Sequence, residues 1–142
     1  MIRLEEISPE NWRYDLRVEK SQQSYVSDGM RLLARAYAYR NYNSVALVIF
    51  NDDTPVGMAL YYDIQEAYDF SQLFIDRKYQ RMGYGEDAAR QIIERMKAEH
   101  RYEKILLCYI EGNEAALSLY RKLGFVHTGE RDGNEIVMEL CI

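Results

Sequence analysis

The sequence has 142 residues, of which 48% are hydrophobic and 29% charged, and its formal net charge is −5. This length fits one ordinary domain, so we expect a single domain over residues 1–142. No apolar run approaches the roughly 20 residues that span a bilayer, and the acidic balance disfavours nucleic-acid binding, which needs clustered Lys and Arg.

The N-terminal part of the chain predicts a strand followed by two helices. Residues Ile2 to Ile7 alternate between apolar and polar, as in a half-buried strand. Ser8-Pro9-Glu10 has the composition of a helix start, with Ser8 as the cap and Pro9 in the first position. A second helix is predicted from Ser27 or Asp28 to about Tyr39, and one face of it would carry Leu32, Leu33, Ala36, Tyr37 and Arg40.

The rest of the chain predicts three strands, a helix, a strand, a helix and a closing strand. The expected elements are strands at 44–50, 56–62 and 68–76, a helix at 85–99, a strand at 104–110, a helix at 114–123 and a strand at 136–140. The face of the first of these helices carries Ala88, Ala89, Ile92, Ile93 and Met96. Hairpins followed by helical crossovers imply a mixed sheet with helices packed on it, and 68–110 should form a parallel strand–helix–strand unit.

Two glycines, Gly83 and Gly85, lie between the strand at 68–76 and the helix at 85–99. Glycine permits positive φ and close approach of a ligand, and the free N–H groups and dipole of a helix N-terminus favour an anion such as a diphosphate. Arg77, Lys78 and Arg81 add positive charge. The pattern equally fits two glycines that only close a tight turn. It lacks the third glycine of a dinucleotide site and the Gly-Lys-Ser/Thr of a P-loop.

Two motifs at this spacing resemble the GCN5-related N-acetyltransferase (GNAT) family. The first is similar to the family's acetyl-CoA motif and reads Leu73-Phe74-Ile75-Asp76-x-x-Tyr79-Gln80-x-x-Gly83-x-Gly85. The second is similar to the family's downstream motif and reads Asn113-x-x-Ala116-x-x-Leu119-Tyr120-x-x-Leu123-Gly124-Phe125. The resemblance implies an α/β (α+β) fold, with a mixed, mostly antiparallel twisted sheet of about seven strands flanked by about four helices. It assigns acetyl-CoA to Leu73, Phe74, Ile75, Gln80, Arg81, Met82, Gly83, Tyr84, Gly85, Asn113 and Tyr120.

Softer patterns resemble the bacterial spermine/spermidine acetyltransferase branch of this family. They are Val18-x-x-x-Gln22-x-x-Tyr25-Val26, Leu33-Ala34-x-Ala36-Tyr37, Val56-Gly57-x-Ala59-Leu60-Tyr61, Thr128-Gly129-Glu130 and Glu135-Ile136-Val137-Met138. Asp28-Gly29 departs from the branch, which would place a small residue and Asn there. The resemblance implies a small cationic amine as substrate. Related enzymes are often dimers, and the sequence leaves a homodimer open.

Asn113 and Tyr120 are seven residues apart, which places them on one helical face. Asn113 fits an N-cap, and the resemblance also implies a contact with the pantetheine arm. Tyr120 fits a core aromatic, and the resemblance places it near the CoA sulfur. A phenol with a pKa of about 10 can protonate the thiolate that an attacking amine expels. The resemblance gives the oxyanion backbone N–H donors on Leu73 to Ile75.

The residue that would deprotonate the amine is not evident. Some related polyamine acetyltransferases have a carboxylate on the fourth strand where this chain has Ser71, and Asp69 lies two residues earlier on the same face. Asp69 fits a base acting through water, or a strand end in solvent. Candidate substrate residues are therefore Asp69, Ser71 and Gln22. Remote ammonium groups could be attracted by other acidic side chains, which individually fit a solvated surface, namely Asp63, Glu66, Glu130 and Glu135.

Two further features complete the sequence-based picture. The cysteines, Cys108 and Cys141, lack the spacing of a zinc site or disulfide framework, and Cys108 in an apolar run predicts a buried thiol. This spacing leads us to expect no metal. The segment after Met1 lacks the apolar h-region of a signal peptide, so we expect a cytoplasmic protein. His100 and His127 have no catalytic spacing. Acetylation of a protein N-terminus or another amine, and a non-catalytic acyl-CoA-binding domain, remain alternatives to polyamine acetylation.

Overall fold

A computed structural model describes residues 1–23 and 28–142. The motif residues Tyr25 and Val26, and Ser27 as a start of the second predicted helix, lie outside the described residues. In chain order the elements are β1 (Ile2–Glu6), the short 3₁₀ turn η1 (Lys20–Gln22), α1 (Gly29–Ala38), η2 (Arg40–Tyr42), β2 (Val45–Asn51), β3 (Thr54–Ile64), β4 (Ala67–Ile75), η3 (Arg77–Tyr79), α2 (Tyr84–Glu99), β5 (Lys104–Ile110), α3 (Glu114–Lys122), β6 (Val126–Asp132) and β7 (Glu135–Cys141).

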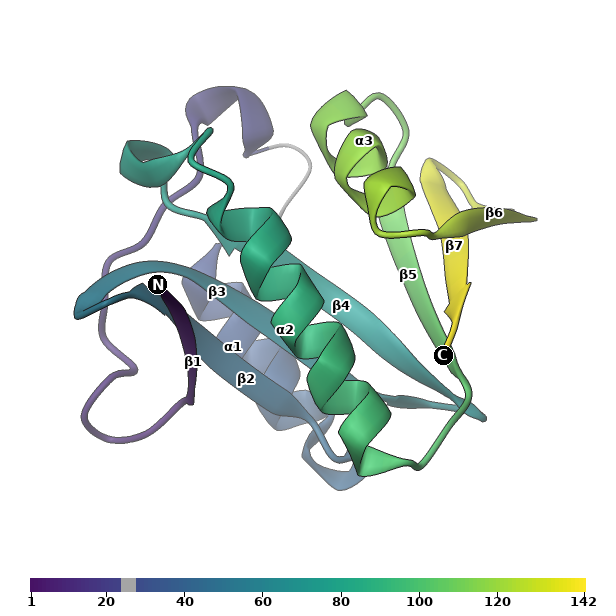
Figure 1. The fold of residues 1–142 in the computed structure, drawn as a ribbon, viewed down its shortest axis with the longest axis horizontal. Helices are drawn as coiled ribbons and strands as arrows, with labels where there is room; N and C mark the ends of the chain where they lie inside the picture. The colour runs from purple at the N-terminus through teal and green to yellow at the C-terminus, as the bar shows by residue number, and fades with distance from the viewer. Residues whose placement is uncertain (24–27) are drawn as a thin grey trace.

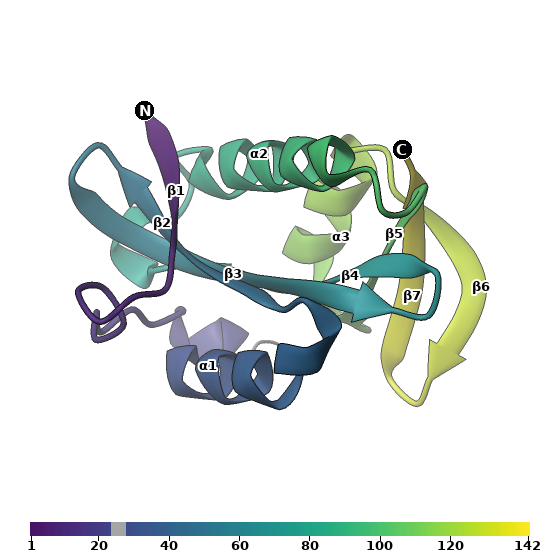
Figure 2. The same ribbon diagram turned by 90° about the horizontal axis from the view of Figure 1, so that it is seen from below.

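One seven-stranded sheet in the order β1-β2-β3-β4-β5-β7-β6 organises the molecule (Figure 1). All neighbouring strands pair antiparallel except β4 and β5, which are parallel. Figure 2 shows α1 on one face of the sheet and α2 with α3 on the other. The predicted mixed, mostly antiparallel sheet and its parallel 68–110 unit are confirmed.

The core has two parts, one on each face of the sheet. On the α2 face, Ala88, Ala89, Ile92, Ile93 and Met96 are all buried, which confirms the predicted apolar stripe of this helix. Burying such a stripe against a sheet supplies most of the free energy that holds a helix of this kind in place.

The α1 face differs from the prediction in part. Leu32 is fully buried among Met58, Leu60 and Phe74, and Leu33 and Ala36 pack against the same cluster. Tyr37 and Arg40, predicted to share this face, are exposed, and the Arg40 guanidinium lies over the Tyr37 ring at 4.2 Å. Tyr39 packs against the cluster instead; it is partly buried and stacks on Tyr62, with ring centroids 4.0 Å apart.

The secondary structure differs from the prediction at two places: one predicted helix is absent and one strand was missed. The segment that starts at Ser8-Pro9 forms turns instead of a helix. Asn11 is buried there, donates hydrogen bonds to Glu5 and Glu6, and accepts one from the Ser8 N–H, so side-chain bonds replace a helical ladder. Strand β6 was not predicted, because it is exposed and charged and is interrupted by an irregularity between His127 and Arg131.

Candidate active site

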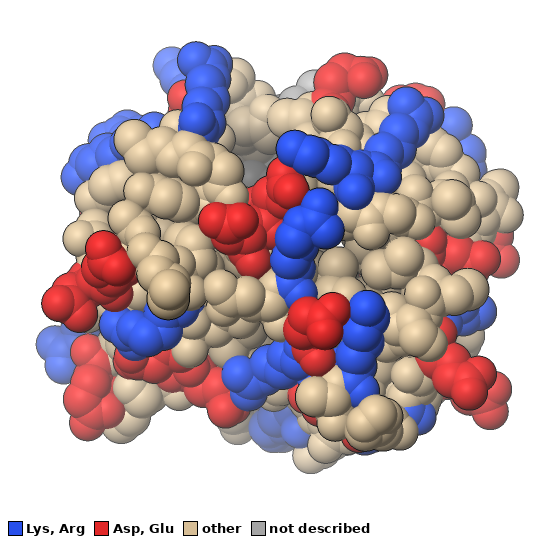
Figure 3. Space-filling view, viewed as in Figure 1, with Lys and Arg blue, Asp and Glu red and all other residues tan. Residues whose placement is uncertain are grey.

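The site lies where β4 and β5 separate. The two strands pair only at Tyr68 with Ile105 and at Asp69 with Leu106, and beyond these residues they diverge (Figure 1). A cleft of about 980 Å³ occupies the space, and it runs from the turn before α2, past α3, to α1. We call this space the cleft. Figure 3 shows the same face hollowed between its two halves, with acidic and basic side chains both on the rim.

A β-bulge shapes the β4 wall of the cleft. Leu60 pairs with Gln72 and Tyr61 with Phe70, so Ser71 is an extra residue in β4. Leu73, Phe74 and Ile75 follow the bulge and line the cleft. Since β4 has no pairing with β5 beyond Asp69, backbone groups on that edge are available to a ligand. These are the residues to which the family resemblance gives the oxyanion donors, and that role stays a prediction.

The glycine turn uses one of its two glycines for backbone geometry. Gly83 has a φ of 81° and is the N-cap of α2, which begins at Tyr84, one residue earlier than predicted. Arg81 also has a positive φ, 63°. Gly85 lies within the first helical turn, and a Cβ there would be 3.6 Å from Ile75, an ordinary contact. The side-chain amide of Gln80 donates to the Ile75 carbonyl over 2.6 Å and so braces the turn.

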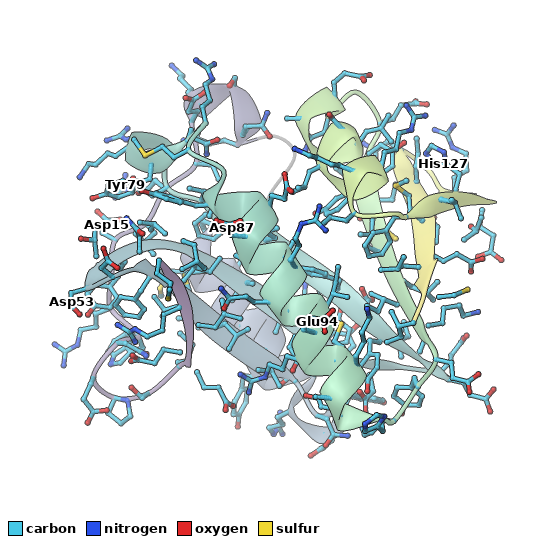
Figure 4. All side chains as sticks on the ribbon, viewed as in Figure 1. Asp15, Asp53, Tyr79, Asp87, Glu94 and His127 are labelled. Atoms are coloured by element: carbon cyan, nitrogen blue, oxygen red, sulfur yellow. The ribbon has the colours of Figure 1, made fainter. Side chains whose placement is uncertain are left out.

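The first turn of α2 carries Glu86 and Asp87, which would oppose an anion at this helix end. Glu86 is neutralised by ion pairs to Arg90 at 3.0 Å and to Lys122 of α3 at 2.8 Å, and these contacts lower its pKa. Figure 4 labels Asp87 at the start of α2 and Tyr79 in the preceding turn. The pair with Lys122 ties α3 to α2 at the cleft.

Asn113 is the N-cap of α3, as one sequence reading predicted. It is buried, and its side-chain oxygen accepts a hydrogen bond from the Ala116 N–H over 3.2 Å. Asn113 also lines the cleft, as do Ala116, Leu119 and Tyr120 of the same helix. The capping role leaves the contact with the pantetheine arm a prediction.

Tyr120 is partly buried, and its ring packs edge-on against Phe125 with centroids 5.9 Å apart. Burial raises the pKa of Tyr120 to about 12. The phenol therefore stays protonated at working pH, which a proton or hydrogen-bond donor requires.

The end of the cleft beside α1 contains Asp69, Ser71 and Gln22, the three residues proposed from the sequence to meet the amine. We call it the acceptor end. Asp69 is the third residue of β4 and is partly buried, so it does not cap the strand in open solvent. The pKa of Asp69 is raised to about 6, chiefly by burial; the charge of Arg35 opposes this rise and the charge of Glu135 adds to it. A carboxyl group with such a pKa can exchange protons near neutrality.

Several residues at this end were missed by sequence reasoning. Arg31 and Arg35 of α1 line the cleft, and the Arg35 guanidinium donates to the Ser71 hydroxyl over 3.2 Å. Tyr39 and Tyr62 form the aromatic part of the wall, and burial raises the pKa of Tyr62 to about 12.

Cys108 lines the cleft and is exposed, so the predicted buried thiol is wrong. Cys108 points away from the core because alternate residues of β5, Leu107 and Tyr109, occupy the buried positions.

Other candidates lie elsewhere. Met82, which the resemblance assigns to acetyl-CoA, does not line the cleft and is 58% exposed. Asp63 is buried and bonded to Arg101 at 2.7 Å, away from the lining residues. Of the other acidic candidates, Glu135 lines the cleft, whereas Glu66 and Glu130 do not. His127 bonds to the Tyr109 hydroxyl over 2.7 Å and lies out on β6 (Figure 4).

Within residues 1–23 and 28–142, no helix is long and apolar enough to cross a membrane. In the same described part of the chain, no group of three or more His, Cys, Asp or Glu side chains could hold a metal ion.

Comparison with known proteins identifies the family. The profile of the "Acetyltransferase (GNAT) family" matches residues 4–125. The chain belongs to this family of N-acetyltransferases. It is 31% identical to the spermine/spermidine N(1)-acetyltransferase of Bacillus subtilis, over 84% of this chain and 83% of that protein.

The fold of this acetyltransferase is shared with solved structures. One is the spermidine N-acetyltransferase of Vibrio cholerae in complex with CoA and spermine, with a TM-score of 0.77, 17% identity, and coverage of 99% of this chain and 95% of that one. Another is the ribosomal-protein-S18-alanine N-acetyltransferase of Escherichia coli, with a TM-score of 0.77, 16% identity, and coverage of 100% and 94%. At these identities the likeness establishes the fold alone.

Proposed function

We propose that this acetyltransferase transfers the acetyl group of acetyl-CoA directly to a primary amine of a small aliphatic amine, the class to which polyamines such as spermidine belong. The observation that carries the proposal is the single cleft that contains the glycine turn, Tyr120 and Asp69. The Bacillus subtilis relative supports the polyamine class, because its name gives spermine and spermidine as acceptors.

The cofactor end would hold the diphosphate of acetyl-CoA at the turn from Gln80 to Gly85. Backbone N–H groups at the start of α2 and the cation of Arg81 provide the positive potential. The pantetheine arm would then follow β4 towards Tyr120, with Asn113 beside it. Backbone N–H groups of Leu73 to Ile75 are the donors that we assign to the oxyanion.

In the reaction, the neutral amine nitrogen attacks the thioester carbon, and the carbonyl becomes an oxyanion. Its collapse re-forms the carbonyl and breaks the C–S bond, and the sulfur takes a hydrogen bond or proton from Tyr120. The nitrogen loses its extra proton to Asp69, directly or through water. Since a free primary amine has a pKa near 10, it is mostly ammonium at neutral pH and must lose a first proton to solvent before it attacks; the proton that Asp69 takes is the second.

The test is an acetyl-CoA consumption assay with spermine, spermidine, putrescine, lysine and short peptides. Turnover with the amines would support the proposal. Turnover restricted to peptides would remove the small-amine claim in favour of protein N-terminal acetylation. CoA binding without turnover of any amine would contradict the proposed reaction and favour an acyl-CoA-binding role.

A further inference from the structure

The acceptor end of the cleft has two walls of opposite charge. Asp69 of β4 and Glu135 of β7 supply carboxylates on one side, and Arg31 and Arg35 of α1 supply guanidinium groups on the other. Glu135 lies at the Ile110 register position of β5, beyond the point where β4 and β5 separate. A molecule bound there therefore meets both signs of charge.

The two arginines act as a pair. They are four residues apart on α1, so their side chains share one helical face. Among the described residues, neither guanidinium forms an ion pair within 4.0 Å, and both line the cleft. The one hydrogen bond from Arg35 to a side chain goes to the neutral Ser71 hydroxyl. Two guanidinium groups that line the cleft, with no described carboxylate within 4.0 Å of either, suit a carboxylate, which they can bind through paired N–H donors.

A simple polyamine is complementary in charge to the carboxylates of the cleft but not to its arginines. Its ammonium groups match Asp69 and Glu135, but each must also lie near the positive charges of α1, and like charges oppose binding. A diamino acid satisfies both walls, since its reacting amine can lie at Asp69 while its carboxylate meets the arginines.

We propose that Arg31 and Arg35 form a carboxylate subsite, and that the preferred acceptor is an amine that carries a carboxylate at its other end, such as the side-chain amine of a basic amino acid. This inference rests on the proposed acetylation of a small primary amine, and it selects within that class against unsubstituted polyamines.

The test uses acceptors that differ only in a carboxylate: lysine against cadaverine, and ornithine against putrescine. For the native enzyme we expect kcat/KM to be about tenfold higher for the amino acid of each pair, the size of one charge-assisted contact. Measured at pH 8, above the break that this variant moves, Arg35→Ala lowers kcat/KM for lysine about tenfold and leaves the value for cadaverine unchanged or higher. Arg31→Ala acts in the same direction. Arg40→Ala, at an exposed position outside the cleft, is the matched control and should preserve the ratio.

Cadaverine and spermidine turning over as well as lysine, with a ratio that Arg35→Ala does not change, would overturn the subsite and leave the proposed acetylation intact. Absence of turnover with every amine would instead count against the proposed function. In that event calorimetric titration of the CoA-loaded protein with lysine and cadaverine decides the inference. Tighter binding of lysine that Arg35→Ala abolishes supports it, and equal binding of the two overturns it.

Discussion

Asp69 on β4 and Glu135 on β7 come from strands on either side of β5 and line the same cleft. The pKa of Asp69 is raised to about 6 as the net result of burial, which raises it, the positive charge of Arg35, which lowers it, and the negative charge of Glu135, which raises it. A carboxyl group set between one cation and one anion should respond to the removal of either in a predictable direction.

The pH dependence of kcat/KM tests Asp69 as the base. Both the substrate amine and Asp69 must be deprotonated for attack, so log kcat/KM should rise with a slope of about 2 below pH 6 and about 1 above it. Glu135→Gln removes a negative charge and should move this break to lower pH. Arg35→Ala removes a positive charge and should move it to higher pH. A slope of about 1 throughout, unchanged in Asp69→Asn, would exclude Asp69 from the proton transfer.

Gly83 allows the cofactor turn to be tested against a matched position. Gly83 and Gly133 both have a positive φ, 81° and 61°, and a Cβ at either would meet nothing within 4 Å. Alanine at each should therefore cost about 1–2 kcal/mol of unfolding free energy through backbone strain alone. Only Gly83→Ala should also raise the Kd of CoA, by about tenfold if one charge-assisted hydrogen bond is lost.

Urea unfolding and CoA titration of the two variants separate stability from binding. Equal losses of CoA affinity in Gly83→Ala and Gly133→Ala would show that the turn before α2 has no special part in binding CoA.

Asp63 should be structural. It accepts hydrogen bonds from Arg101 and Asn43, both at 2.7 Å, and from Tyr102 at 3.3 Å. Asp63→Ala leaves Asn43 and Tyr102 without this acceptor and Arg101 with only its pair to Glu99, and we expect it to lower the free energy of unfolding by about 2–4 kcal/mol while kcat of the folded enzyme is retained. Asp15→Ala breaks an exposed pair with Arg17, which solvent screens, and should leave the free energy of unfolding nearly unchanged. Urea denaturation measures both, and a large loss of kcat in Asp63→Ala would contradict the assignment.

The sequence predicted the cofactor end of the cleft more fully than the acceptor end. The glycine turn and the α3 cap are local features, because Gly83 and Asn113 determine the conformation of the residues next to them. The helical stripe of α2 is equally local, and its five predicted residues are buried.

The acceptor end depends on contacts across the chain that no local pattern encodes. Arg35 reaches Ser71 from a different element, 36 residues away in sequence. The bulge that places Ser71 appears only in the pairing of β4 with β3. The helix expected at Ser8-Pro9 failed for a similar reason, since Asn11 and Asp76 hold that segment through bonds to Glu5, Glu6 and the Arg17 N–H. One signal was available in the sequence: Arg31 and Arg35 repeat at helical spacing beside the buried Leu32.

Tyr120→Phe is the most direct test of the central claim that the cleft catalyses acetyl transfer with Tyr120 assisting the leaving sulfur. Phenylalanine preserves the ring that packs on Phe125, so folding and the KM for acetyl-CoA should remain near the native values. We predict that kcat falls by about 100-fold or more at every pH, the usual size of a lost general acid. Tyr42→Phe, an exposed tyrosine outside the cleft, should keep the native kcat. A Tyr120→Phe enzyme with native kcat across the pH range would contradict the account.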